Sequence, residues 1–191
     1  MITSELSVYQ NGITGAGPGD WFGLDAPDGD AGAWVEAPVG SRYFRKMGEG
    51  GIWFTKVAAT GKDNDWRPTH GAIVQTFTKA DFTDGGAAVG TLVLDYGIPL
   101  GATVVRSFLL ALTGFTGDTS CTLTVGDGTD PDRYNTGTPS IFTTAAGETD
   151  LGAISGTAYH TAAKSVTLTA TSNSDWGLVT AGQATIVIVL G

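Results

Sequence analysis

The sequence predicts an all-β protein with an extended N-terminal arm (1–36), a small β-hairpin module (37–70) and a C-terminal antiparallel β-sandwich of the jelly-roll type (71–191). Three observations predict this fold class. Short runs rich in Val, Ile and Thr recur along the chain, separated by clusters of Gly, Asp, Asn and Pro. No segment keeps the apolar period of an amphipathic helix. Charged residues make up only 15% of the chain, and 29 glycines suit the tight turns between short strands.

The arm has no periodic apolar face. It contains six acidic residues and no Lys or Arg, and Gly and Pro interrupt it throughout. It nevertheless carries large aromatic residues, which are rare in disordered tails. We therefore expect an arm that becomes ordered against another surface, through the aromatic side chains Tyr9, Trp21, Phe22 and Trp34.

The module is basic and aromatic, since six of the ten basic residues lie between Arg42 and Arg67. Strands are predicted over 41–46 and 52–56, and the Gly-rich residues 47–51 predict a hairpin loop between them. A third element is expected to end at Trp66, before Arg67-Pro68. Such a module is too small to be stable alone.

Strand patterns recur from Ala72 onward. Residues 120–125 alternate cleanly, with Cys121, Leu123 and Val125 on one face and hydroxyl side chains on the other. Further strands are predicted over 73–78, 91–94, 103–112, 165–171 and 183–190. Several short strands without a helix between them favour an antiparallel sandwich or jelly roll.

Two of these strands are apolar on both faces. In 183–190, Val187 and Val189 lie opposite a row of Ala, Ile and Leu residues. In 104–112 the two predicted faces are Phe108, Leu110 and Leu112 on one side and Val105, Leu109 and Ala111 on the other. A simple sandwich leaves the outer face of each sheet to water. We therefore expect another copy of the chain to bury the second face; the alternative is that the arm folds across its own sandwich.

No catalytic constellation is evident. The two histidines are His70, at the junction of module and sandwich, and His160, in a loop rich in Ser, Thr and Ala. No serine lies in a Gly-x-Ser-x-Gly elbow, and no pair of carboxylates suggests glycoside cleavage. The Gly-rich residues 12–19 lack the Gly-Lys-Ser/Thr ending of a phosphate-binding loop. We expect a protein that is not an enzyme and uses no cofactor.

Two polar features favour structural explanations. The run from Asp127 to Asp132 has enough side-chain oxygens to bind calcium, but it lacks the residue order of an EF-hand loop. An acidic turn capped by Arg133 is the preferred interpretation. The single cysteine, Cys121, excludes an internal disulfide and is expected in the core.

Charge and hydropathy exclude several partners. The net charge is −9, with ten basic residues against nineteen acidic ones, which argues against nucleic-acid binding. No apolar run approaches the roughly 20 residues of a membrane span. The first residues lack the pattern of a signal peptide. We therefore expect synthesis in a cytoplasm and no membrane partner.

The module carries a family resemblance. Ala37-Pro38-Val39-Gly40-Ser41-Arg42-Tyr43-Phe44-Arg45, followed by Trp53-Phe54-Thr55-Lys56 and a closing Trp66, resembles a short module of bacteriophage virion proteins. In that pattern a P-x-G-S-x-Y-x-R strand pairs with a Y-x-K strand, and Phe54 stands at the tyrosine position here. Residues 98–105 and 125–134 are similar to a β-sandwich of phage particle proteins. The resemblance implies a homotrimer on the virion surface.

These expectations lead to one function and one alternative. The first is a capsid cement or decoration protein, a trimer on the outer surface of the phage head, made in the host cytoplasm, that bridges subunits of the major capsid protein. The alternative is a short head or tail fibre, or adhesin, that binds a host surface glycan. The lack of a long repetitive shaft favours the cement protein. The arm aromatics Tyr9, Trp21, Phe22 and Trp34 would contact the coat, and the trimer interface would include Phe108, Leu110, Val187 and Val189.

Overall fold

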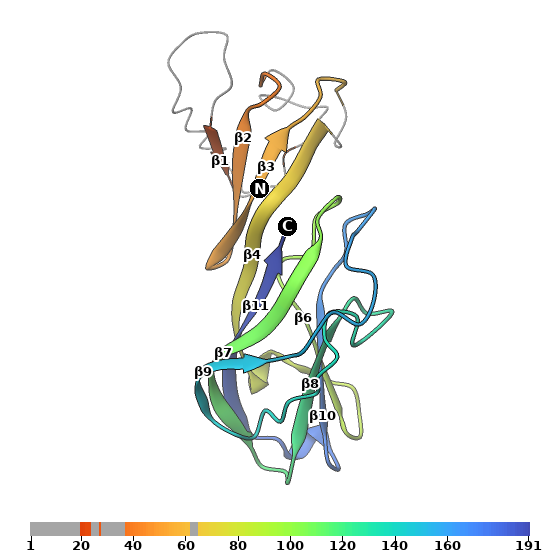
Figure 1. The fold of residues 1–191 in the computed structure, drawn as a ribbon. Helices are drawn as coiled ribbons and strands as arrows, with labels where there is room; N and C mark the ends of the chain where they lie inside the picture. Colours follow the sequence, from red (N-terminus) through yellow and green to blue (C-terminus); the bar gives the residue numbers. More distant parts are fainter. Residues whose placement is uncertain (1–19, 24–26, 28–36, 62–64) are drawn as a thin grey trace, which may run out of the picture.

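The computed structural model describes residues 20–23, 27, 37–61 and 65–191. Over this part of the chain the protein is all-β, as predicted, and its strands form two sheets packed as a β-sandwich (Figure 1). The described helical structure consists of short 3-10 segments, among them η2 (Lys79–Asp81) and η3 (Trp176–Leu178). Every strand predicted from the sequence corresponds to a strand of the structure.

The larger sheet has the strand order β1-β2-β3-β4-β11-β7-β9. Neighbouring strands are antiparallel, except that β1 pairs with β2 in parallel. Its strands are β1 (Asp20–Gly23), β2 (Arg42–Met47), β3 (Gly50–Lys56), β4 (Trp66–Thr78), β11 (Ala181–Leu190), β7 (Val104–Thr116) and β9 (Ala145–Asp150).

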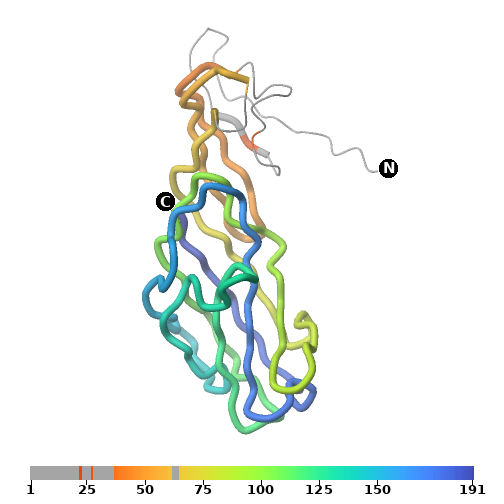
Figure 2. Tube along the Cα trace, turned by 90° about the vertical axis from the view of Figure 1, so that its right-hand side faces the viewer, coloured from red at the N-terminus to blue at the C-terminus, as the bar shows by residue number. Residues whose placement is uncertain are grey.

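The smaller sheet has the strand order β5-β6-β10-β8 and is antiparallel throughout. Its strands are β5 (Thr83–Asp84), β6 (Val89–Val93), β10 (Thr167–Ser172) and β8 (Cys121–Gly126). It covers the lower part of the larger sheet only, so the molecule is elongated (Figures 1 and 2). We call the upper part, β1 to β3 with the first residues of β4 (66–70), the tip, and the rest the body.

Strand β4 runs through both parts. Its first half pairs with β3, from Trp66 opposite Lys56 to Ala72 opposite Gly51, and its second half pairs with β11. The expectation that the third element ends at Trp66 is therefore wrong: β4 begins at Trp66 and passes through Pro68. The register shifts opposite Pro68, between Trp53 and Phe54, and such an irregularity accommodates a residue that has no N–H to donate. The expected boundary between residues 70 and 71 falls inside this strand.

The core lies between the two sheets of the body. Cys121, Leu123 and Val125 of β8 are fully buried, which confirms the inward face predicted from their alternation. An aromatic cluster fills one end of the core, with neighbouring ring centroids 5.0 to 6.4 Å apart: Phe77, Phe82, Phe115 and Trp176. The indole of Trp176 lies directly on Gly90 of β6, where a Cβ atom would stand 2.3 Å from Cε2.

A bulge in β7 changes which residues face inward. Ala111 has a positive φ of 49°, and two residues of β11 span three residues of β7 between the pairs Thr185–Leu110 and Gln183–Thr113. The extra residue turns Leu112 to the inner face, where it is buried like Leu109. The expectation that Leu112 shares a face with Phe108 and Leu110 is therefore wrong.

We predict that Gly90→Ala destabilises the body by about 1–3 kcal/mol, because the new methyl group overpacks the indole of Trp176. The matched control is Gly147→Ala in β9, where a Cβ atom would meet nothing within 4 Å. Urea unfolding of both variants measures the difference. A Gly90→Ala midpoint equal to that of Gly147→Ala would contradict the packing described for β6.

Candidate interaction face

The four residues expected at a self-association interface lie on one face of the larger sheet. Val187 pairs directly with Phe108, and Thr185 pairs with Leu110, so these side chains point to the same side. Ile186, Ile188 and Leu109 point to the opposite side and are fully buried in the sandwich. Phe108, Leu110, Val187 and Val189 therefore lie on the outer face, away from the smaller sheet.

The outer face combines apolar side chains with the hydrogen-bonded hydroxyl groups of Thr76 and Thr185. Leu110 is 36% exposed, whereas Val187 is only 7% exposed between its cross-strand neighbours Val74 and Phe108. The guanidinium of Arg106 lies 4.7 Å from the ring centroid of Phe108 and forms an ion pair with Glu148 of β9. Part of the apolar surface is thus covered by a side chain that could move aside at little cost, since exposed ion pairs contribute little to stability.

The same face continues into the tip as an aromatic cluster. Phe22 of β1 lies 6.4 Å from Phe44 and 5.8 Å from Trp53, and Phe44 and Trp53 are 5.2 Å apart, measured between ring centroids. The guanidinium of Arg42 lies 5.2 Å from the ring centroid of Trp53. Sequence reasoning missed this cluster, although alternation along residues 42–46 does place Arg42 and Phe44 on one side of a strand.

Part of the arm packs on its own chain. Phe22 is 37% exposed and rests on Phe44 and Trp53 while β1 extends the sheet next to β2. Trp21 is also in β1, but its side chain is not described, and Tyr9 and Trp34 lie outside the described residues. Residues 20–23 therefore pack on the small module of their own chain, and not across the sandwich.

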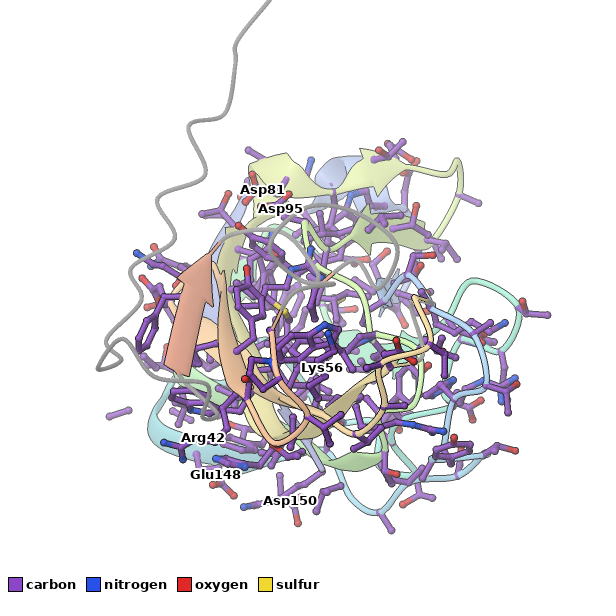
Figure 3. The ribbon with its side chains drawn as sticks, turned by 90° about the horizontal axis from the view of Figure 1, so that it is seen from above. Arg42, Lys56, Asp81, Asp95, Glu148 and Asp150 are labelled. Carbon is purple, nitrogen blue, oxygen red and sulfur yellow. The ribbon has the colours of Figure 1, made fainter. Side chains whose placement is uncertain are left out.

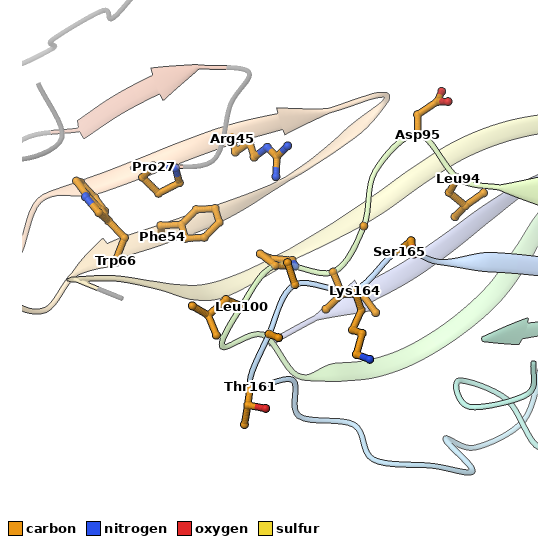
Figure 4. A pocket seen from close by; sticks show the side chains of 15 residues that line it. Pro27, Arg45, Phe54, Trp66, Leu94, Asp95, Leu100, Thr161, Lys164 and Ser165 are labelled. Atoms are coloured by element: carbon orange, nitrogen blue, oxygen red, sulfur yellow. The ribbon is translucent and has the colours of Figure 1, made fainter. Parts of the chain in front are cut away.

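An open cleft of about 880 Å³ separates the tip from the loops of the body (Figure 4). Phe54, Trp66 and Arg45 line it from the tip, and Pro99 and Leu100 line it from the body. Pro27, from the N-terminal segment, is buried in the same cleft. The cleft is mainly apolar, with the Arg45 side chain pointing into it, and it was not predicted from the sequence.

The run from Asp127 to Asp132 forms a turn. The Oδ1 atom of Asp127 accepts hydrogen bonds from the backbone N–H groups of Thr129 (3.2 Å) and Asp130 (3.1 Å). Its Oδ2 atom forms ion pairs with Arg133 Nε (3.0 Å) and Lys164 Nζ (3.6 Å). The Arg133 N–H is not aimed at that oxygen, so the contact is electrostatic rather than a hydrogen bond. Burial opposes ionisation, but these donors and cations outweigh it and lower the pKa of the Asp127 carboxyl.

His160, in the loop rich in Ser, Thr and Ala, lies against this turn and is buried. Its Nε2 atom is 3.2 Å from the hydroxyl of Tyr134. Burial lowers the pKa of His160, and the neighbouring cations Arg133 and Lys164 lower it further, while Asp127 opposes them. His70 is not in a linker as expected; it is exposed on β4 and belongs to the outer face beside Trp53.

The described residues offer little reactive chemistry. Burial raises the pKa of the Cys121 thiol to about 12, so this cysteine is an inert core residue. No group of three or more His, Cys, Asp or Glu side chains in the described part of the chain could hold a metal ion. No helix among those residues is long and apolar enough to span a membrane. The outer face of the larger sheet is therefore the strongest candidate site.

Comparisons with known proteins do not assign the chain to a family: no family model, no curated protein and no solved structure matches it.

We predict that acidification from pH 7 to pH 5 destabilises the protein through His160. Its pKa is lower in the folded state than the ordinary value of 6.5, so the unfolded chain binds more protons below that pH. The contribution of neutral His160 to the free energy of unfolding is therefore fully present above about pH 6.5. It is lost as the pH falls through that value toward the pKa of the folded state. Urea unfolding as a function of pH measures this slope. His160→Gln should flatten it between pH 7 and 5, whereas His70→Gln should leave it unchanged; equal slopes in all three proteins would show that His160 is not the cause.

Proposed function

We propose that this chain is a non-enzymatic structural protein of a bacteriophage particle, a trimeric cement protein that bridges subunits of the major capsid protein on the outside of the head. The observation that carries the proposal is the apolar outer face of the larger sheet. In the described residues no second layer covers this face over the body, although Phe108, Leu110, Val187 and Val189 all lie on it. An apolar sheet face without a covering layer calls for a protein partner.

The resemblance of residues 37–66 to a module of phage virion proteins indicates that the assembly is a phage particle. In this setting copies of the chain associate through the outer face, and the arm residues Tyr9, Trp21 and Trp34 contribute contacts to the coat. Phe22 packs against Phe44 and Trp53 of its own chain, and its exposed part contributes to the same contact with the coat. Weak contacts from each arm would sum to tight binding because three arms on one trimer act together.

A second candidate function rests on the cleft between tip and body. A cleft of about 880 Å³ that combines aromatic residues, an arginine and backbone groups suits a saccharide. This favours a short fibre or adhesin that binds a host surface glycan. Copy number separates the two functions: hundreds of copies per particle support cement, and a few copies at one vertex or on the tail support a fibre.

We predict that Leu110→Asp disrupts self-association, because it places a charge on the outer face at an apolar position that pairs with Glu148 of β9. Val93→Asp is the matched control, since Val93 is 59% exposed on the smaller sheet, away from that face. Sedimentation equilibrium at micromolar concentration should show trimers for the natural chain and the control and mainly monomers for Leu110→Asp. A monomeric natural chain would refute the trimer.

We predict that replacing two arm aromatics, as in Tyr9→Ser with Trp34→Ser, weakens binding to coat particles that lack this protein, while the trimer stays intact. Aromatic side chains of the arm bury much area at little entropic cost, so their loss should reduce binding at least tenfold. Tyr159→Ser is the control, since Tyr159 is a 46% exposed aromatic of the body. Cosedimentation with the particles measures both variants. Normal decoration by the double variant would show that these two arm residues do not hold the coat.

A further inference from the structure

The outer face differs in charge at its two ends. At the tip end, Arg42 and Lys46 of β2 are exposed and alternate with Phe44 on that face. At the other end, Glu148 and Asp150 of the edge strand β9 pair in register with Leu110 and Phe108. Figure 3 shows Arg42, Glu148 and Asp150 along the same flank of the molecule. One face thus carries a basic aromatic end and an acidic aliphatic end.

The sequence from residue 37 onward has the same polarity, whereas residues 1–36 carry six acids and no Lys or Arg. Residues 37–70 contain six Lys and Arg against three acids, whereas residues 71–191 contain four against ten. Residues 37–70 therefore carry a net positive charge and residues 71–191 a net negative charge. Copies of such a molecule repel each other when like ends meet and attract when the tip of one approaches the body of another.

We propose that the partner of the outer face is a second copy of this chain, and that the basic aromatic end of one copy binds the acidic end of the next. Arg42 and Lys46 of one copy face Glu148 and Asp150 of its neighbour. The rings of Phe22, Phe44 and Trp53 then cover Leu110 and Phe108. This inference rests on the proposed self-association, and it adds the orientation of the contact.

The sheet topology fits a contact between two different patches. β1 and β9 are the opposite edges of the larger sheet, so the basic end and the acidic end of the face are two different patches. A contact that joins one patch to a different patch is heterologous, and such contacts close into a ring when the rotation between copies allows it.

The ion pair between Arg106 and Glu148 would have to rearrange when a second copy binds. Arg106 now covers Phe108 and neutralises one of the two carboxylates. Arrival of Arg42 or Lys46 from a neighbour would give Glu148 a second cation and allow Arg106 to uncover the ring of Phe108. The exposed pair contributes little to the stability of one chain, so its rearrangement costs little.

Charge exchange in the full-length chain tests the contact. Reversal at the tip (Arg42→Glu with Lys46→Glu) or at the body (Glu148→Lys with Asp150→Lys) sets like charges against each other and should weaken self-association at least roughly tenfold. The chain that carries all four substitutions restores opposite charges across every contact and should regain association to within about threefold of the natural chain. Asp81→Lys with Asp95→Lys is the matched control, because Asp81 and Asp95 lie on the opposite flank (Figure 3).

Sedimentation equilibrium at low and high salt provides the measurement, and urea unfolding checks that each variant is folded. Recovery in the fourfold variant, with salt-sensitive association, supports the contact. Equal association of both reversed variants and the natural chain overturns it, as does failure of a folded fourfold variant to recover. Recovery of a dimer instead of a trimer would support the contact and refute the trimer of the proposed function. If the charge substitutions have no such effect but the natural chain is a trimer that Leu110→Asp disrupts, only the orientation proposed here is refuted.

Discussion

The structure depends on one strand that belongs to two parts of the molecule. β4 spans 13 residues, and its pairing passes from β3 to β11 near residues 71 and 72. A two-stranded hairpin such as β2–β3 is at best marginally stable in water. Because β4 continues into the packed sandwich, the hairpin pairs with a strand whose other half is held in place by the core. The tip therefore projects from the body without a core of comparable size.

A sheet that extends beyond its sandwich partner has apolar side chains on two faces, and both faces need a covering layer. In the body, the inner face is covered by the smaller sheet, and fully buried side chains such as Ile186 and Ile188 fill the space between them. In the tip, the rings of Tyr43, Phe54 and Trp66 pack together on the inner side, with centroids about 6.3 Å apart. The outer face has no such layer over the described body residues, which makes it the place where a partner can bury apolar area.

The sequence predicted the fold class because strand alternation survives wherever the backbone is regular. The burial of Cys121, Leu123 and Val125 follows directly from that alternation. It fails in β7, because the bulge at Ala111 lies in a run of apolar residues, where nothing in the pattern marks an extra residue. β9 was missed since Ala-Ala-Gly-Glu-Thr-Asp has low strand propensity and is held only by pairing with β7. The parallel pairing of β1 and the cleft around Pro27 depend on contacts distant in sequence, which no local pattern reveals.

The two edges of the larger sheet bear on how copies would meet in the proposed association, because both edges oppose extension of the sheet. β1 contributes only four residues to one edge, and β9 places Glu148 and Asp150 on the other. Short edge strands and charged edge residues both discourage another strand from pairing there. A partner that avoids these edges must use a face, and the inner face of the larger sheet is already packed. The outer face remains, and its opposite charges at β2 and β9 limit how a second copy can approach. The charges would then determine orientation, while Phe108, Leu110 and the tip aromatics would supply most of the buried apolar area.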